Sequence, residues 1–544
     1  MKPYIIAILL LNYFLTTAQD QNSLVAKKQE LTEEQLKTWY FLDYTEDTIP
    51  GISLDKAYRD LIKDKKGQEV IVAVLDTKLD IHHEDLKGQL WINTDEIPDN
   101  GIDDDHNGYI DDINGWDFLS NPKGDFVKYQ LLEIARIVKR YDQLFKGKRR
   151  EDIQESLKNK FDLYTLAYKD WHKAIVEKEE NLMYLQNWKQ NYLSGKSLMD
   201  SLALHNHDLK MIDSIIKIPD LDSTKINALK GYRNAFKYEF TIKDLNEFIS
   251  ESVQEKDKML NLDYNERTII GDDPQNIKDS FYGSHIVYGE VPFNHSTEVS
   301  GVIAANRNNN VGANGISNLI KIMPIVMVAS GDEHDKDVAL AIRYAVDNGA
   351  KVINMSWGKY LSSNKDWVDE AFRYASENDV LLVSGAGNDN LNNDESHIYP
   401  SDNDFKTNKE FVKNHIVIGA SSPNISNLKT GFSNYGQKKV DLFAPGVSIY
   451  STHVNNEYGF VRGTSFAAPI VSGLAALLRS YYPKLTAMQV KQILMDSGTP
   501  YNIELEITLE NNSKKMMPFS ELSKSGKVVN AYNALLMAEE LSKK

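Results

Sequence analysis

Short apolar runs that are rich in β-branched residues recur along this chain, with helical sequence between them. Five such runs span residues 70–75, 320–328, 350–357, 379–387 and 415–421. A strand that is apolar at every position is typical of a parallel sheet covered on both faces. Amphipathic segments at 335–349 and 364–379 lie between successive runs. This alternation predicts a three-layer α/β fold around a mostly parallel sheet.

One long region interrupts this alternation. Residues 124–279 are highly charged, and their apolar residues recur at three- and four-residue spacing, which predicts long amphipathic helices. We interpret the region as a helical insertion that lies over one end of the α/β core. Residues 19–66 form a polar N-terminal extension with helical stretches. The α/β pattern itself occupies residues 67–123 and 280–544.

The first 18 residues have the layout of a secretory signal peptide. Lys2 is followed by an apolar run from Tyr4 to Leu15 and by small residues that end at Ala18. A membrane anchor is the alternative, but the run is shorter than the roughly 20 residues of a spanning helix. No other segment is long and apolar enough to span a bilayer. We therefore expect an exported protein, whether secreted, periplasmic or held at the cell surface.

Net charge and cysteine content exclude several classes of function. The formal net charge of −16, without a basic patch, argues against a nucleic-acid partner. The chain has no cysteine, which excludes disulfides, thiol nucleophiles and cysteine-ligated zinc. The sequence leaves the oligomeric state open.

Four polar residues stand where a strand or loop leads into the next element: Asp76, His295, Asn388 and Ser465. In open α/β sheets, ligands bind outside the carboxyl ends of the strands. A serine becomes a nucleophile when a histidine removes its proton, and an aspartate can hold that histidine in the required tautomer. An asparagine amide can donate to the developing oxyanion. Ser465 by itself could also be a helix N-cap, but the four residue types together favour acyl transfer.

The segments around these residues resemble the signature blocks of the subtilisin-like serine proteases. They read VAVLDTKLDIHHEDL, NHSTEVSGVIAA, SGAGNDN and GTSFAAPIVSGLAALL, and they follow the order of that family. The resemblance implies a seven-stranded parallel sheet and peptide-bond hydrolysis without a catalytic cofactor. It also implies a triad of Asp76, His295 and Ser465, with Asn388 as the oxyanion donor. The segment AKVINMSWG implies that Ser356, Trp357 and Gly358 pair with the substrate.

Three residues depart from the family pattern. The family's histidine block usually reads His-Gly-Thr-His, whereas this chain has Ser296 and Glu298 after His295. If Glu298 lies near His295, its charge raises the pKa of the imidazole. Lys78 stands where the family has glycine. These changes keep open an alternative function, in which a catalytically weak or inactive subtilase fold binds a partner through its helical insertion.

An acidic loop predicts a second kind of site. The stretch GIDDDHNGYIDDINGWDF matches the start of an oxygen-ligand calcium loop. The expected ligands are Asp103, Asp105, Asn107, the carbonyl of Tyr109 and Asp111. The usual glutamate twelve positions from the start is replaced by Asn114, and Asp112 is a further candidate source of oxygen ligands. A structural Ca²⁺ is therefore one interpretation, and an acidic turn without metal is the other.

Overall fold

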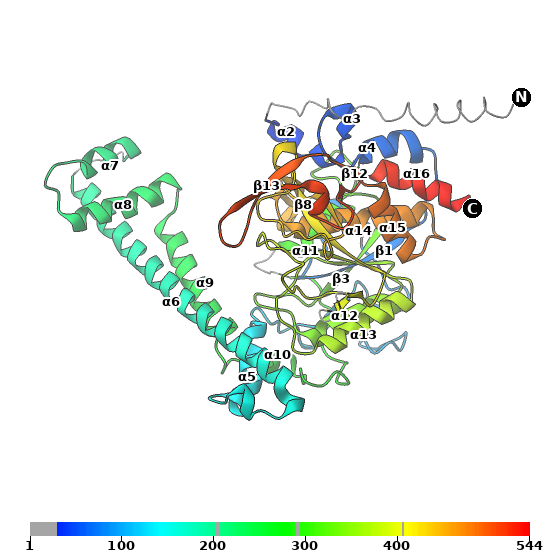
Figure 1. The fold of residues 1–544 in the computed structure, drawn as a ribbon, viewed down its shortest axis with the longest axis horizontal. Helices are drawn as coiled ribbons and strands as arrows, with labels where there is room; N and C mark the ends of the chain where they lie inside the picture. The colour runs from blue at the N-terminus through cyan, green and yellow to red at the C-terminus, as the bar shows by residue number, and fades with distance from the viewer. Residues whose placement is uncertain are drawn as a thin grey trace, which may run out of the picture.

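The computed structural model describes residues 30–202, 207–289, 294–307, 309–404, 407 and 409–543. The predicted signal peptide lies outside these residues. Within them, the α/β pattern forms a compact core, and the helical region projects from it as an arm (Figure 1).

The core is built on one large sheet in which nearly all strands are parallel. Its strand order is β12-β15-β9-β8-β5-β4-β1-β3-β2, and only β12 is antiparallel to its neighbour. The strands are β1 (Val70–Asp76), β2 (Trp116–Asp117), β3 (Ile320–Val326), β4 (Val352–Met355), β5 (Leu381–Gly385), β8 (His415–Ser421), β9 (Leu442–Pro445), β12 (Thr499–Pro500) and β15 (Lys527–Val528). The mostly parallel architecture is confirmed. The sheet of the described residues has nine strands rather than seven, because short strands of two residues extend both edges.

Among the described residues, three antiparallel pairs of strands lie outside this sheet. They are β6 (Asn403–Asp404) with β7 (Lys409–Glu410), β10 (Ile449–His453) with β11 (Glu457–Val461), and β13 (Glu504–Thr508) with β14 (Lys514–Pro518). The β10–β11 pair packs on the helix that begins with His295 and so borders the candidate site.

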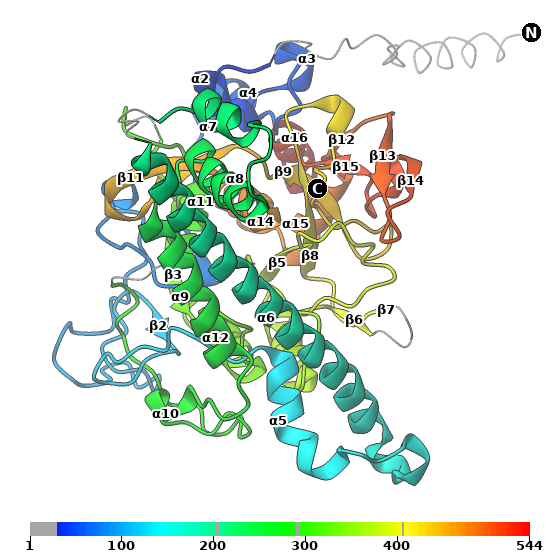
Figure 2. The same ribbon diagram turned by 90° about the vertical axis from the view of Figure 1, so that its left-hand side faces the viewer.

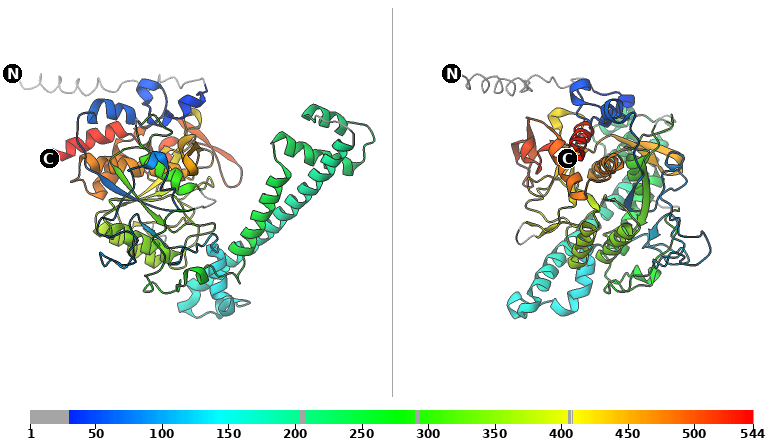
Figure 3. Two further views of the ribbon diagram at one scale, coloured as in Figure 1. Left: turned by 180° about the vertical axis from the view of Figure 1, so that it is seen from behind. Right: turned by 90° about the vertical axis from the view of Figure 1, so that its right-hand side faces the viewer.

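Helices cover both faces of the large sheet (Figures 1 and 3). One layer contains α11 (His295–Ala304), α14 (Thr464–Tyr481), α15 (Ala487–Ser497) and α16 (Ala531–Ser542), and the other contains α12 (Asp335–Asp347) and α13 (Lys365–Glu377). Strand β1 shows why its sequence is apolar throughout. Val70, Val72 and Val74 pack in the first layer, whereas Ala73 and Leu75 pack in the second.

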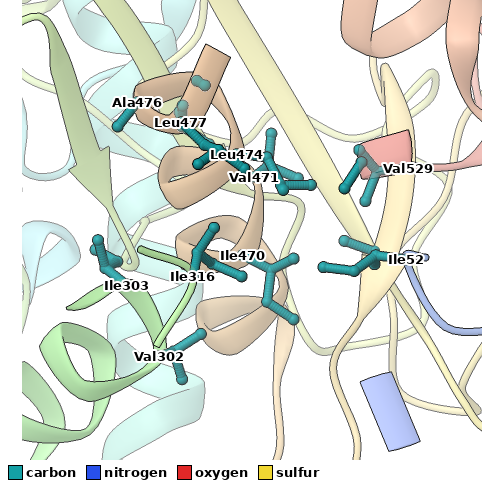
Figure 4. Close-up of a cluster of buried hydrophobic side chains, with 14 of the residues drawn as sticks. Ile52, Val302, Ile303, Ile316, Ile470, Val471, Leu474, Ala476, Leu477 and Val529 are labelled. Atoms are coloured by element: carbon teal, nitrogen blue, oxygen red, sulfur yellow. The ribbon is translucent and has the colours of Figure 1, made fainter. Parts of the chain in front are cut away.

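Helix α14 is the centre of the first layer. Its side chains Ile470, Val471 and Leu474 are at most 1% exposed. They lie between side chains of α11 on one side and Ile52 and Val529 on the other (Figure 4). Burial of each such side chain contributes roughly 1.5–3 kcal/mol relative to exposure. The helix is therefore anchored along its length, which holds Ser465, its second residue, in place.

The N-terminal segment from residue 30 onward packs into the same core. It contains α2 (Glu33–Leu36), α3 (Tyr44–Asp47) and α4 (Leu54–Ala57). Trp39 is fully buried, and its indole N–H donates to the carbonyls of Val447 and Ser448 at 3.2 and 3.1 Å. The Tyr40 hydroxyl donates to the carbonyl of Tyr450 at 3.0 Å. Because these aromatic residues pack into the core, the described part of this extension is anchored on the α/β domain.

The helical region forms a long arm. It consists of α5 (Glu133–Phe145), α6 (Lys158–Ser201), α7 (Leu209–Ile216), α8 (Ser223–Lys237), α9 (Ile242–Met259) and α10 (Arg267–Ile270). Helix α6 has 44 residues and runs from the core to the tip, with α9 beside it on the return (Figure 2). Helices α6 and α8 pack closely at Gly195, where an added Cβ would lie 2.3 Å from the carbonyl oxygen of Ala228. No helix in the described part of the chain has the length and hydropathy of a membrane span.

Candidate active site

The four predicted catalytic side chains come together at one edge of the large sheet. Asp76 ends β1, His295 begins α11, Asn388 follows β5 and Ser465 lies in the first turn of α14. The carboxyl ends of parallel strands share one edge, so loops that are distant in sequence meet there. Direct contacts join Asp76 to His295, and Asn388 to the residue before Ser465.

Asp76 and His295 form a close pair. The Nδ1 atom of His295 lies 2.8 and 2.9 Å from the two carboxylate oxygens of Asp76. Asp76 is fully buried, and its Oδ1 also accepts a hydrogen bond from the Thr77 N–H at 2.7 Å. Burial favours the neutral imidazole, but the charge of Asp76, its hydrogen bond and the charge of Glu298 together hold the pKa of His295 above its ordinary value.

Ser465 lies at the start of α14, directly before a residue that contacts His295. The ring of its neighbour Phe466 is 5.5 Å from the ring of His295, measured between centroids. The Ser465 hydroxyl donates to the carbonyl of Ser356 at 3.0 Å, and no hydrogen bond joins these described Ser465 and His295 side chains. The backbone N–H of Ser465 lies in the first helical turn, where amide groups have no acceptor within the helix. It is therefore free to donate to a ligand.

The orientation of the Asn388 amide follows from its neighbours. Its Oδ1 accepts hydrogen bonds from the backbone N–H and the hydroxyl of Thr464, at 2.9 and 3.1 Å. The Thr464 hydroxyl in turn accepts from the Gly387 N–H at 3.2 Å. Because the oxygen is engaged in this way, the amide NH₂ of Asn388 is turned to the side where it can donate.

The predicted substrate-pairing segment is held against the start of α14. The Ser356 hydroxyl donates to the carbonyl of Ser465 at 2.7 Å and accepts from the Asn354 amide at 2.9 Å. The indole N–H of Trp357 donates to the carbonyl of Leu75 at 2.7 Å, which anchors this ring on β1. A cavity of about 370 Å³ opens beside this segment, and Ser356, Trp357, Gly358, Asn388 and Ser465 are among its lining residues.

Comparisons with known proteins show the family of this chain. The model described as the subtilase family matches residues 211–519, more than half of the chain. This chain belongs to the subtilase family. It is 36% identical over 209 residues to subtilisin DY of Bacillus licheniformis, a match that covers 38% of this chain and 70% of that protein.

Two further relatives share shorter parts of their length. The chain is 33% identical to a thermophilic serine proteinase of Bacillus sp. (strain AK1), over 44% of this chain and 52% of that protein. It is 33% identical to the cell wall-associated protease of Bacillus subtilis (strain 168), over 39% of this chain and 22% of that protein. A solved structure of a protease from Pseudoalteromonas arctica PAMC 21717 is 26% identical, covers 45% of this chain and 70% of that chain, and has a TM-score of 0.37.

The residues in which this subtilase departs from the family pattern all have partners or places in the structure. Ser296 is buried, and its backbone N–H donates to the Thr77 hydroxyl at 3.1 Å. Lys78 is buried in an ion pair with Asp117 at 3.3 Å. Glu298 lies one helical turn after His295 and pairs with His453 Nδ1 at 2.9 Å. His453 lies on β10, far from Glu298 in the sequence, so no local sequence pattern identifies it as the partner of Glu298.

Replacing Glu298 by glutamine should move the pH dependence of this subtilase. The negative charge of Glu298 helps to raise the pKa of His295, so its removal lowers that pKa. A general base must be neutral, so activity should then persist to lower pH. The measurement is the acidic midpoint of kcat/KM, or of the rate of phosphonate labelling, between pH 5 and 10. Glu504→Gln is the matched control, and a midpoint that stays in place in Glu298→Gln would contradict this assignment.

The acidic loop of the subtilase gathers three carboxylates. One carboxylate oxygen from each of Glu96, Asp105 and Asp112 lies within 4.8 Å of the other two. Burial, together with the charge of Asp105, raises the pKa of Asp112 to about 6. Asp105 and Asp112 were candidate ligands from the sequence, whereas Glu96 precedes the motif and was missed.

The other predicted ligands of this loop are engaged in hydrogen bonds. Both oxygens of Asp103 accept backbone N–H groups, from Asn107 at 3.0 Å and Gly108 at 2.9 Å. Asp111 likewise accepts from two backbone N–H groups, at 3.1 and 3.0 Å. The Asn107 side-chain oxygen accepts from the Tyr109 N–H at 2.7 Å. These bonds shape the loop. Glu96, Asp105 and Asp112 accept hydrogen bonds as well, and their close mutual approach is what distinguishes them as candidate cation ligands.

Proposed function

We propose that this chain is an exported serine endopeptidase that hydrolyses polypeptides through an acyl-enzyme. Asp76, His295 and Ser465 form its triad, and Asn388 with the Ser465 N–H forms its oxyanion hole. The observation that carries the proposal is the Asp76–His295 pair, 2.8 Å apart, in a chain of the subtilase family. The His295 ring contacts that of Phe466, which directly follows Ser465. Export is supported by the sequence of residues 1–18.

Each side chain has a defined step in this proposal. The Ser465 hydroxyl exchanges the Ser356 carbonyl for Nε2 of His295, which takes the proton as Oγ attacks the scissile carbonyl carbon. His295 then gives this proton to the leaving amine, the C–N bond breaks, and an ester to Ser465 remains. Water attacks the ester with His295 again as base, which releases the carboxyl product and restores Ser465. Asp76 accepts from Nδ1 throughout and stabilises the imidazolium.

The proposal also includes a division of the chain into domains. We propose residues 67–123 and 280–544 as the catalytic domain, residues 124–279 as an insertion and residues 19–66 as an extension. Residues Ser356, Trp357 and Gly358 would pair with the backbone of a polypeptide substrate. No cofactor takes part in the proposed reaction.

Fluorophosphonate labelling of the purified protein tests the function. Labelling should occur in the wild type and be lost in Ser465→Ala and His295→Ala, because the reagent reacts with a serine that its histidine has activated. Labelling across pH 5 to 10 should rise through the pKa of His295. A wild-type protein that melts cooperatively but is not labelled by any phosphonate would contradict the protease proposal.

The alternative function is an inactive subtilase fold that binds a partner through its arm. One observation favours it, namely the Ser465 hydroxyl bonded to Ser356 rather than to His295. Labelling distinguishes the two functions, since the alternative requires a folded protein with an unreactive Ser465.

We propose that Glu96, Asp105 and Asp112 bind a structural Ca²⁺. Calcium takes oxygen ligands, and three clustered carboxylates supply part of its coordination. Saturating Ca²⁺ should raise the melting temperature by roughly 5 °C over EDTA-treated protein, since a ligand at about 100 times its Kd contributes ~2.7 kcal/mol. Asp105→Asn should abolish this increase, whereas Asp257→Asn on the arm should keep it. Equal melting temperatures with Ca²⁺ and EDTA would show that the loop folds without metal.

A further inference from the structure

The cavity beside Ser465 is acidic. Two carboxylates, those of Glu333 and Asp389, line this space of about 370 Å³, and Lys359 is the one cation among its described lining residues. The loop between β3 and α12 contributes Glu333, and Asp389 directly follows Asn388. These positions are far apart in sequence, so only the fold brings their charges to the same space.

Glu333 is an unusual member of this lining. The residue is 4% exposed, and its Oε2 atom has no hydrogen-bond partner among the described residues. Burial and the neighbouring charge of Asp332 raise the pKa of Glu333 to about 7. A buried carboxylate without a donor costs free energy, which a ligand that supplies the donor recovers. Binding of a positively charged hydrogen-bond donor to this carboxylate is therefore favourable.

Lys359 does not supply this donor, because its ammonium group already contacts other acceptors. It lies 2.8 Å from Asp335 and 3.3 Å from Glu133 and donates to the backbone carbonyl of Glu333 at 2.6 Å. Its charge lowers the pKa of Glu333 only in part. The net charge of the cavity lining, with its two carboxylates, stays negative.

The base of the arm holds the Glu333 loop in place. Arg136 of α5 donates to the carbonyls of Asp332 and Glu333 at 2.8 and 2.9 Å, and it also pairs with Glu133. These bonds fix the main chain on either side of the Glu333 side chain. Preorganised charges of this kind recognise a ligand with little cost in ordering.

The second carboxylate lies at the rim. Asp389 is exposed, its backbone N–H donates to Asn434 at 3.0 Å, and its side chain accepts a hydrogen bond from the Tyr360 hydroxyl. The lining also includes Ile398 and Trp357, which can pack against an aliphatic stem. The cavity thus has apolar side chains in its lining, one carboxylate at its rim and one buried carboxylate.

We propose that this cavity takes a cationic side chain, lysine or arginine, from the substrate residue whose carbonyl Ser465 attacks. This inference rests on the proposed function and adds its substrate class. A lysine or arginine side chain would supply the missing donor to Glu333 and a counter-charge to Asp389. An acidic side chain would be repelled, and an apolar one would leave the Glu333 carboxylate unpaired.

Matched peptides test the inference. Two fluorogenic substrates differ only in arginine or citrulline before the scissile bond, since citrulline has a similar shape without the charge. We expect the wild type to have a kcat/KM about 10–100 times higher for the arginine peptide, as for a hydrogen bond to a charged group. The ratio should decrease in Glu333→Gln and in Asp389→Asn, and to below about threefold in the double variant. It should be unchanged in Glu504→Gln, which removes an exposed carboxylate on β13.

Each preparation is first titrated with a fluorophosphonate to separate two failures. A wild type that is labelled at Ser465 but hydrolyses both peptides equally overturns the cationic preference and leaves the protease proposal standing. A double variant that keeps the full ratio also overturns it. A folded wild type without labelling overturns the proposed function, and the inference with it. The wild-type comparison needs no variant, so a misfolded variant does not block the test.

Discussion

Asp76→Asn should reduce kcat by about 10⁴, with the fold intact. Asp76 is fully buried, and both of its oxygens lie within 2.9 Å of Nδ1 of His295. An asparagine amide in the same place can donate to Nδ1, which leaves the proton on Nε2 and prevents that nitrogen from accepting the Ser465 proton. The measurement is kcat on a peptide substrate, with the concentration of folded protein taken from its absorbance and its melting curve.

A matched variant distinguishes this effect from a general loss of charge. Asp257→Asn makes the same change on an exposed position of α9 and should leave kcat within about twofold. An Asp76→Asn protein with nearly full activity would show that His295 does not need this partner. It would thereby remove the observation on which the proposed function rests.

Asn388→Ala should reduce kcat by about 10²–10³ with little change in KM. The Asn388 amide is oriented by the two hydrogen bonds from Thr464, and its NH₂ group is available to an oxyanion that exists only in the transition state. A donor to such an oxyanion contributes roughly 3–4 kcal/mol to transition-state stabilisation. Because the Asn388 oxygen also caps the start of α14 through these two bonds, its truncation should lower the free energy of unfolding by about 1 kcal/mol, a small decrease in melting temperature. Steady-state kinetics and a melting curve make both measurements.

Asn378→Ala is the control, because it removes an exposed amide at the end of α13, away from the candidate site. An Asn388→Ala protein whose KM increases while kcat stays constant would identify Asn388 as a ground-state binding residue instead. In that case the Ser465 N–H and other groups would have to stabilise the oxyanion.

The fold could be predicted largely from local pattern. The five apolar runs became β1, β3, β4, β5 and β8, because a strand buried on both faces has to be apolar at every position. The spacing of apolar residues in 124–279 likewise indicated the helices of the arm. The two-residue strands β2, β12 and β15 and the four-residue strand β9 of the same sheet were missed, since segments this short show little periodicity.

The candidate triad was also accessible from sequence, since each member follows a strand or begins a helix within a family block. The partners of these residues were not. Glu298 pairs with His453 on β10, and Trp39 is buried against the loop before the same strand. Glu333 lines a cavity with Ser465, although 131 residues lie between them in the sequence.

The sequence by itself therefore determined the order of strands and helices, the family blocks and the residue types available for chemistry. Those properties depend on neighbours within a few positions, where periodicity acts. The tertiary structure alone decided that one oxygen of Glu333, which lines a cavity with Ser465, lacks a hydrogen-bond donor among the described residues, and that Glu96 and Asp112 join Asp105. Such features arise where crossover connections bring distant loops to one sheet edge, and burial there sets which charges are paired.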